Sequence, residues 1–293
     1  MEKENKTILK HTLLCGGIGI LTLISLKLFK KVFDTWKKNH KNKKEENGPQ
    51  KYKIIEKTYL TKGTTHPVVK FKLATQDETK NLGIDIGDHI KIYNDDKSIF
   101  RPYTPITHID TKGYFEVVFK IYNKVNDKPA GKLSQFLKTK NVGDHLLIAV
   151  PMKGHKIRKS TKNVTLVAGG TGITPCYQAL LHWLEDSENK QGRITLLYAN
   201  STEEDIILKK YLDELQDTYK DQLKIVYLVS RPSGNWKGIK GRINKELINR
   251  FIPSLEKEPS QQVGICGPAP FVKSVRSILQ ERGMKRKTHF FVY

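Results

Sequence analysis

The chain has 293 residues, of which 38% are hydrophobic and 28% charged, so it is long enough for two ordinary domains and too apolar for a disordered protein. The formal charge of +22 favours contact with nucleic acid, anionic lipid or an acidic protein. Residues 1–50 carry +6 of this charge, so residues 51–293 carry +16 and are basic in their own right. Cys15, Cys176 and Cys266 lie far apart with no histidine cluster beside them. We therefore expect no metal site and no disulfide framework, and a reducing compartment is the simpler interpretation.

Residues 8–29 are predicted to form a transmembrane anchor. The stretch from Thr12 to Leu26 carries no charge, and Lys10 and Lys27 near its ends can extend their ammonium groups towards lipid head groups. At about 1.5 Å per residue such a helix is about 33 Å long, enough to cross a bilayer once. A cleavable signal peptide is the alternative, but no small-residue cleavage site follows the apolar run.

Lysines are more frequent after the predicted anchor than before it. The positive-inside rule therefore predicts a single-pass protein whose residues 30–293, including any catalytic domains, face the cytosol. Residues 1–7 are expected to be a polar N-terminus, and residues 30–50 a basic linker without periodic apolar positions. The endoplasmic reticulum and the mitochondrial outer membrane both suit such an anchor.

Two patterns of secondary structure follow one another in the rest of the chain. Residues 51–150 contain short β-type runs between Gly, Asp and Asn turns, which is typical of a small antiparallel barrel. After a linker over 151–162, residues 163–293 alternate strands with helices, which indicates a parallel α/β sheet. The expected strands are 52–60, 68–73, 89–93, 114–122, 145–150, 164–168, 194–199, 224–229 and 262–266; the expected helices are 175–185, 203–215, 243–251 and 270–282.

The segment AGGTGITP, residues 168–175, follows a buried strand and leads into a helix. Its three glycines let the backbone approach a phosphate closely, and the free N–H groups of a helix start favour an anion. The pattern is GGxG rather than GxGxxG, so it gives little support to a standard dinucleotide fold. A plain strand-to-helix turn is the alternative interpretation.

Two further motifs carry polar and aromatic groups suited to a cofactor. RPYTPIT, residues 101–107, combines an arginine that can grip phosphate with an aromatic ring and hydroxyl donors. CGPAPF, residues 266–271, follows a predicted strand, and ligands bind at the carboxyl ends of strands in open α/β sheets. Taken alone, the first could be strand packing and the second a buried structural cysteine.

In this order and on these elements, the three motifs resemble the NADH-cytochrome b5 reductase family within the ferredoxin-reductase-like flavoenzymes. The resemblance covers about residues 50–293. It implies an antiparallel β-barrel FAD-binding domain over 51–150 and an α/β parallel-sheet NAD(P)H-binding domain over 163–293. The implied reaction takes hydride from NADH or NADPH onto flavin N5 and passes single electrons to cytochrome b5.

The resemblance also implies roles for individual residues. For FAD it implies Arg101 at the phosphates, Gly131, Lys132, Leu133 and Ser134 at the pyrophosphate, and Pro102, Tyr103, Thr104, Thr107, Val118, Lys120 and Thr174 around the flavin. For the nicotinamide nucleotide it implies Gly169, Gly170, Thr171, Gly172, Ser230, Arg231, Gly267 and Pro268. Thr104 and Cys266 are the implied catalytic residues, beside the flavin and the nicotinamide ring.

The sequence departs from the family pattern at two places. The turn after the barrel reads VPMKGH, with Val150 where relatives have glycine, which puts contacts there in doubt. NADH-preferring relatives carry an aspartate where this chain has Ser230, followed here by Arg231. A hydroxyl beside a guanidinium suits a 2′-phosphate, so use of NADPH is one hypothesis; a solvated Arg231 with retained NADH preference is the other. Whether Tyr293 stacks on the flavin or merely packs is open.

The implied partner is cytochrome b5 or another acidic one-electron acceptor, which the positive charge of residues 51–293 would attract. We expect no nucleic-acid partner, because the sequence has no zinc-finger, helix-turn-helix or aromatic RNA-binding signature. A quinone or ferric-chelate reductase with the same flavin chemistry is an alternative. A membrane-tethered adaptor that has lost its cofactor is another.

Overall fold

The computed structural model describes residues 48–61, 64–159 and 161–293, with Ser187 described by its backbone alone. The predicted anchor and nearly all of the predicted basic linker lie outside these residues. Among the residues described, no helix is both long and apolar enough for a membrane span.

The first half of the described chain is a six-stranded antiparallel sheet in the order β4-β3-β6-β1-β2-β5. Its strands are β1 (Gln50–Tyr59), β2 (Val68–Ala74), β3 (His89–Tyr93), β4 (Phe100–Tyr103), β5 (Tyr114–Lys120) and β6 (His145–Met152). The sheet curls so that its two edges meet: the backbone N–H of Ile106, just after β4, donates to Glu116 O of β5 at 2.9 Å. Buried phenylalanines fill the interior, and helix α2 (Lys132–Thr139) adds Leu133 and Leu137 to that core. This half is therefore the expected barrel.

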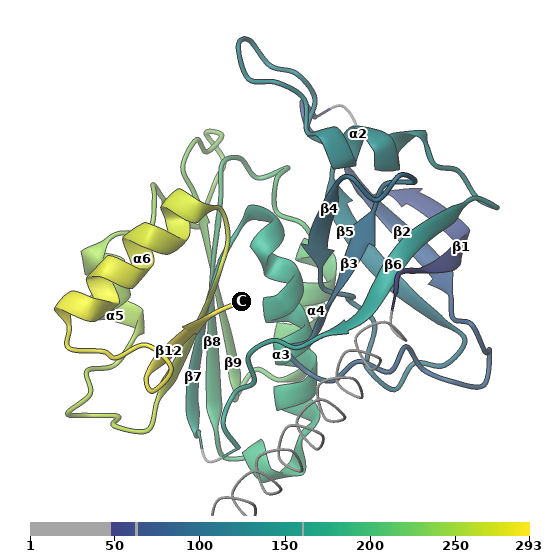
Figure 1. The fold of residues 1–293 in the computed structure, drawn as a ribbon. Helices are drawn as coiled ribbons and strands as arrows, with labels where there is room; N and C mark the ends of the chain where they lie inside the picture. The colour runs from purple at the N-terminus through teal and green to yellow at the C-terminus, as the bar shows by residue number, and fades with distance from the viewer. Residues whose placement is uncertain (1–47, 62–63, 160) are drawn as a thin grey trace, which may run out of the picture. The chain divides into compact units, whose positions relative to one another are not determined.

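The second half is a six-stranded parallel sheet in the order β10-β9-β8-β7-β11-β12. Helices α3 and α4 pack on one face and α5 and α6 on the other (Figure 1). Because both faces are covered, strands such as β7 and β11 are buried along nearly their whole length and are rich in apolar residues. The elements are β7 (Asn163–Gly169), α3 (Ile173–Glu185), β8 (Arg193–Asn200), α4 (Lys209–Thr218), β9 (Leu223–Val229), β10 (Ile239–Lys240), α5 (Lys245–Phe251), β11 (Gln262–Cys266), α6 (Ala269–Glu281) and β12 (Phe290–Val292).

The strand order reverses direction between β7 and β11. The chain runs outward from β7 through β8 to β9 and β10, then returns to place β11 on the other side of β7. The connections after β7 and β11 therefore leave from neighbouring strand ends towards opposite faces, and open α/β sheets bind ligands at such a point. The glycine loop and the CGP motif both lie there.

Helix α4 begins at Lys209, whereas the sequence predicts a helix from residue 203. Leu208 has a left-handed backbone (φ +60°), which interrupts a helix at that position. The apolar run before it is buried for another reason: Tyr198 Oη accepts the N–H of Ile207 at 3.2 Å, so the loop is tied to the end of β8. The apolar residues of this buried loop therefore give the same sequence pattern as the apolar face of a helix.

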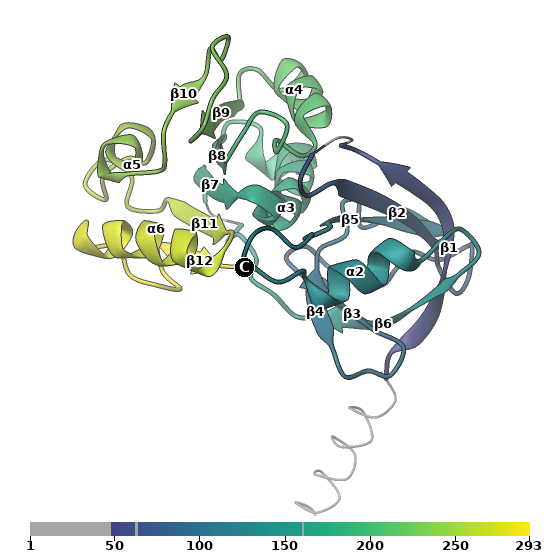
Figure 2. The same ribbon diagram turned by 90° about the horizontal axis from the view of Figure 1, so that it is seen from above.

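Helix α3 lies between the parallel sheet and the barrel (Figure 2). It is joined to the barrel by a buried hydrogen bond from Gly87 N to Gln178 Oε1 at 2.8 Å. The backbones at Gly87 and Gly154 also approach each other closely, since a Cβ on Gly154 would lie 1.7 Å from Gly87 O. Residues 49–293 form one compact unit, so a fixed cleft can exist between its two sheets.

Candidate functional site

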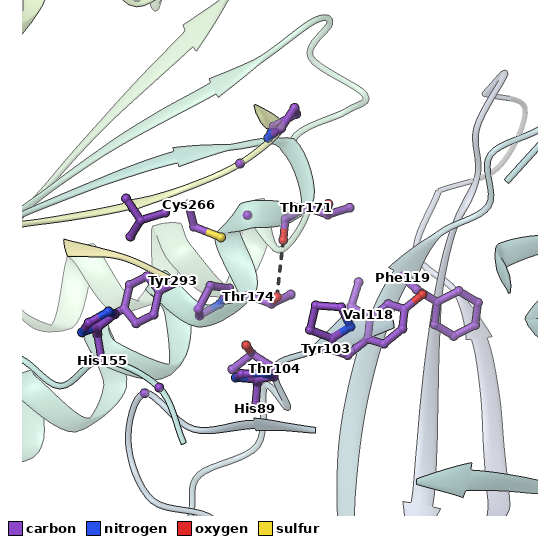
Figure 3. Close-up of a pocket in the computed structure, with 18 of the residues that line it drawn as sticks. His89, Tyr103, Thr104, Val118, Phe119, His155, Thr171, Thr174, Cys266 and Tyr293 are labelled. Carbon is purple, nitrogen blue, oxygen red and sulfur yellow. Dashed lines mark hydrogen bonds between the residues drawn. The ribbon is translucent and has the colours of Figure 1, made fainter. Parts of the chain in front are cut away.

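A cleft of about 680 Å³ opens between the barrel and the α/β domain, within the range of sites for cofactors and drug-sized ligands. Figure 3 draws the residues around it, with those of the barrel facing those of the α/β domain. Its lining comprises Gly87, His89, Pro102, Tyr103, Thr104, Val118, Phe119, Lys120, Tyr122, Lys153, Gly154, His155, Thr171, Gly172, Thr174, Pro175, Cys266, Gly267, Pro268, Val292 and Tyr293.

The barrel wall of the cleft comes from the neighbouring strands β4 and β5. Val118 and Lys120 are two residues apart on β5 and so share one face of the sheet. The Tyr103 ring meets Phe119 edge-on at a centroid distance of 6.3 Å, and burial raises the pKa of the Tyr103 hydroxyl above its usual value. This wall is therefore an uncharged aromatic and aliphatic surface with the Lys120 ammonium at one side, which fits a flat heteroaromatic ring.

The opposite wall is formed by the glycine loop and the CGP loop, which touch through their backbones. A Cβ on Gly172 would lie 2.4 Å from Cys266 O, and a Cβ on Gly267 would lie 3.2 Å from the Cα of Gly169. Thr174 Oγ1 donates to Thr171 O at 3.3 Å, the dashed line in Figure 3. The two motifs that stand out in the sequence thus form a single wall, and each needs the glycines of the other.

Cys266 and Tyr293 lie on this wall beside Thr174 (Figure 3). Burial raises the pKa of the Cys266 thiol to about 11, so it is neutral at pH 7 and suited to contact rather than nucleophilic attack. Burial also raises the pKa of Tyr293. The Tyr293 ring contacts Phe291 edge-on at 5.1 Å, and its backbone N–H donates to Ile265 O at 3.0 Å, so the ring is fixed at the edge of the cleft.

A second hollow of about 550 Å³ begins at the glycine loop and crosses the carboxyl ends of β7, β8 and β9. Gly170 has φ +54° and nothing within 4 Å of where a Cβ would be, so its backbone is open to a ligand. Tyr198 Oη donates to Gly170 O at 3.1 Å and fixes this turn. The hollow is lined by Lys120, Tyr122, Gly169, Gly170, Thr171, Ala199, Asn200, Ser201, Asp205, Ser230, Gly241, Arg242, Ile243, Pro268, Pro270, Phe271 and Ser274.

An ion pair joins the two domains where the cleft and the hollow meet. Lys120 Nζ lies 2.5 Å from Asp205 Oδ1, with both side chains largely buried. Burial opposes ionisation of Asp205, but Lys120 and the hydroxyl of Thr202 outweigh this effect and lower its pKa. Asp205 is therefore a carboxylate at neutral pH. Among the described residues, no cluster of three or more His, Cys, Asp or Glu side chains could hold a metal ion.

Several residues implied by the resemblance lie away from both hollows. The exposed Arg101 donates from Nη1 to Phe100 O at 2.7 Å, and Thr107 Oγ1 accepts the N–H of Glu116 at 3.4 Å. Gly131 to Ser134 form the start of α2, where Ser134 Oγ accepts from Tyr122 N at 3.1 Å and donates to Gly131 O at 2.9 Å. Arg231 is exposed on the loop after β9, whereas Ser230 lines the second hollow.

Sequence reasoning missed His89, Tyr122, His155, Asn200 and Arg242, all of which line one of the hollows. Asn200 ends β8, so the rule about carboxyl ends of parallel strands could have found it. His89 begins a predicted strand, but a sequence pattern does not reveal that the α/β domain faces it. Arg242 follows the two-residue strand β10, which is too short to give a periodic signal.

The chain matches two protein families, the oxidoreductase FAD-binding domain over residues 52–156 and the oxidoreductase NAD-binding domain over residues 166–277. NADH-cytochrome b5 reductase 1 of Candida glabrata is 35% identical over 273 residues, covering 89% of this chain and 91% of the relative. The chain belongs to the NADH-cytochrome b5 reductase family. The matches divide it into an FAD-binding and an NAD-binding domain, as the resemblance implies.

Two other family relatives differ in extent. NADH-cytochrome b5 reductase 2 of Aspergillus oryzae is 34% identical over 216 residues, which cover 72% of this chain and 64% of the relative. The crystal structure of the cytochrome b5 reductase domain of Ulva prolifera nitrate reductase superimposes with a TM-score of 0.74 at 31% identity, covering 84% of this chain and 97% of that domain. The two-domain fold is therefore that of a solved family member.

Proposed function

We propose that this chain is an FAD-dependent oxidoreductase that takes hydride from NADH and passes electrons to cytochrome b5. The observation that carries the proposal is the cleft in which an uncharged aromatic barrel wall faces the joined glycine and CGP loops. When bound there, FAD supplies the conversion of a two-electron hydride into single electrons. The protein contributes binding, alignment and exclusion of water.

On the flavin side, we assign ring contacts to Tyr103, Thr104 and Val118, which line the cleft. The exposed guanidinium of Arg101 and the free backbone N–H groups at the start of α2 are suited to the phosphates of FAD. Since Ser134 Oγ is engaged with the backbone of Tyr122 and Gly131, its part in phosphate binding is to shape the loop. Thr107 likewise supports the motif, because its hydroxyl accepts from the adjoining strand.

On the nucleotide side, Gly170 offers an open backbone to a phosphate, and we assign Thr174 and Cys266, which line the cleft, to the wall against which the reacting rings would lie. The neutral Cys266 thiol adds no charge beside the site of hydride transfer. Hydride transfer needs close alignment rather than an acid or base, so the cleft needs no catalytic triad. The hydroxyl of Thr174 is already oriented by Thr171 O, which makes its position on the wall independent of a ligand.

The relatives' names support cytochrome b5 as acceptor, and so does the charge of +16 on residues 51–293, which favours an acidic partner.

For residues 8–29 we propose a membrane anchor with residues 30–293 in the cytosol, on the basis of the uncharged run and the lysines after it. The proposed domain boundaries remain 51–150 for FAD and 163–293 for the nucleotide. Carbonate extraction of membranes from expressing cells, comparing the full chain with residues 48–293, tests the anchor; release of the full chain contradicts it.

The purified full chain in detergent tests the reaction. A flavin absorption band that bleaches on anaerobic addition of NADH and returns on addition of oxidised cytochrome b5 is the expected result. A tenfold faster return with a quinone or a ferric chelate would instead favour the alternative acceptors. A colourless protein that gains no flavin band with added FAD contradicts the proposal and favours the adaptor.

A further inference from the structure

The second hollow has a polar end. The parts that NADH and NADPH have in common do not account for it. The hollow runs from Gly170 past Asn200 to Ser230, the residues at the carboxyl ends of β7, β8 and β9. It finishes at Arg242, just after β10. With a pyrophosphate at the glycine loop, the adenosine half of the nucleotide lies towards β9 and β10.

The carboxylates near this end are engaged elsewhere. Asp205 is the one carboxylate among the residues described as lining the hollow, and it is paired with Lys120 at 2.5 Å. Glu203 Oε1, outside the lining, accepts both the N–H and the hydroxyl of Ser233, at 3.0 and 2.8 Å. A ribose 2′-OH is usually bound by an Asp or Glu, and among the lining residues the one carboxylate, Asp205, is already paired with Lys120.

The residues that do line this end are Ser230, which carries a hydroxyl, and the exposed Arg242, which carries a guanidinium. Within the part of the chain that the structure describes, the Arg242 side chain forms neither an ion pair nor a hydrogen bond. An unpaired guanidinium and a hydroxyl are together complementary to a phosphate: the guanidinium supplies the opposite charge, and both groups donate hydrogen bonds to phosphate oxygens.

The backbone explains why this arginine, rather than Arg231, reaches the hollow. Strand β10 pairs in parallel with β9, with Lys240 opposite Val229. Gly241 then turns with φ +110° while its N–H donates to Val229 O at 2.8 Å, which brings Arg242 beside Ser230. The N–H of Arg231 donates to Ser201 O at 2.8 Å, and its exposed side chain lies outside the lining.

We propose that Arg242, with the Ser230 hydroxyl, binds the 2′-phosphate of NADPH, so that this chain uses NADPH as well as NADH. The proposal rests on the proposed oxidoreductase function, since it assigns the adenosine end of the same nucleotide site. A charge-assisted contact of this kind changes affinity by about 10- to 100-fold. The site is open to solvent, so the advantage given to NADPH falls as ionic strength rises.

Stopped-flow flavin reduction of the full-length holoenzyme by NADPH and by NADH tests the assignment. In Arg242→Gln, we expect the apparent Kd for NADPH to rise about 10- to 100-fold and that for NADH to change less than about threefold. Lys237→Gln is the matched control, an exposed cation on the same loop outside the lining, and leaves both values unchanged. An equal loss for both nucleotides, or a loss of NADPH binding confined to Arg231→Gln, overturns the proposal.

A binding measurement separates this inference from the reaction. Calorimetric titration with 2′-phospho-AMP and with 5′-AMP needs no hydride transfer. We expect the first to bind about 10- to 100-fold more tightly, with the difference lost in Arg242→Gln. Equal binding of the two, or no detectable binding of 2′-phospho-AMP, overturns the role of Arg242. Failure of both NADH and NADPH to bleach the flavin would overturn the oxidoreductase function itself.

Discussion

The backbones of two loops touch at Gly172 and Cys266, and this contact decides the shape of the nucleotide wall. A side chain at Gly172 would enter the space of a carbonyl group, which cannot move without displacing the CGP loop. At Gly170, by contrast, a side chain would meet open space, although its positive φ disfavours one. The neighbouring glycines therefore do different work: Gly172 permits packing, and Gly170 leaves the backbone accessible.

We predict that Gly172→Ala lowers the free energy of unfolding by about 1–3 kcal/mol, because a Cβ there would lie 2.4 Å from Cys266 O. The shift of the CGP loop should also weaken NADH binding. Urea denaturation and NADH titration measure the two effects. Gly234→Ala is the control, since nothing lies within 4 Å of its added Cβ. Equal stability of the two variants would contradict the close contact.

A second prediction at this scale concerns the Cys266 thiol, whose pKa burial raises to about 11. Because only the thiolate reacts, alkylation by iodoacetamide at pH 7.5 should be about 300-fold slower than for a thiol of ordinary pKa, about 8.5. The rate should keep rising up to the folded pKa or to the onset of alkaline unfolding. Mass spectrometry of the labelled peptide measures it, with the fully buried Cys176 as an internal control. A plateau below pH 9 would contradict the assignment.

Single residues also mark how far the sequence could predict the site. The sequence singles out Tyr103, Gly170 and Cys266, which line the two hollows, because special side chains or glycines are grouped within a few positions. It does not single out Arg242, because its place depends on the pairing of β10 with β9 and on the turn at Gly241. Such positions follow from tertiary structure and leave no local pattern.

At the scale of elements, most strands and helices could be predicted because their apolar periodicity is strong. The prediction was wrong at the start of α4, where Ile206 to Leu208 are buried by a loop tied to Tyr198 rather than by a helix. The two-residue β10, the three-residue β12 and the four-residue β4 were missed, since strands this short have no period, and the eight-residue helix α2 was missed as well. Length and tertiary hydrogen bonds thus limit what periodicity reveals.

Helix α3 holds the barrel through Gln178, whose Oε1 accepts the N–H of Gly87 at 2.8 Å. We predict that Gln178→Leu costs about 1 kcal/mol: the buried N–H loses its acceptor, while loss of the unpartnered Nε2 offsets part of that penalty. Chemical denaturation measures the change. Gln280→Leu, at an exposed position on α6, is the control and should be nearly neutral. A stabilised Gln178→Leu variant would contradict the importance of this bond.

At the scale of the whole molecule, the Lys120–Asp205 pair bridges the two domains, and the folded-state pKa of Asp205 is lowered. Its stabilising contribution is therefore present above the unfolded pKa of about 3.9 and is lost as the pH falls through the lower folded value. We predict that Asp205→Asn costs about 1–2 kcal/mol at pH 7 and that the difference from the native chain shrinks below pH 4. Urea midpoints at pH 7 and pH 3 measure it. A constant difference would contradict the ionic contribution.

The charge of the molecule gives a further prediction. Because residues 51–293 carry +16, encounter with an acidic cytochrome should be electrostatically steered. We predict that kcat/KM for cytochrome b5 falls about tenfold between 10 mM and 500 mM salt. The rate with ferricyanide, a small acceptor, should fall less. Equal salt dependence for the two acceptors would contradict steering by a protein-sized charged surface.

The cleft and the second hollow share part of their lining, namely Lys120, Tyr122, Thr171 and Pro268. A ligand that orders these side chains in the cleft therefore changes the affinity of the second hollow for its own ligand, and the reverse also holds. Thermodynamic linkage makes that influence reciprocal: the factor by which bound flavin alters nucleotide affinity equals the factor by which nucleotide alters flavin affinity. How tightly the flavin is retained during turnover then depends on the concentration of the nucleotide as well as on the contacts made by the barrel.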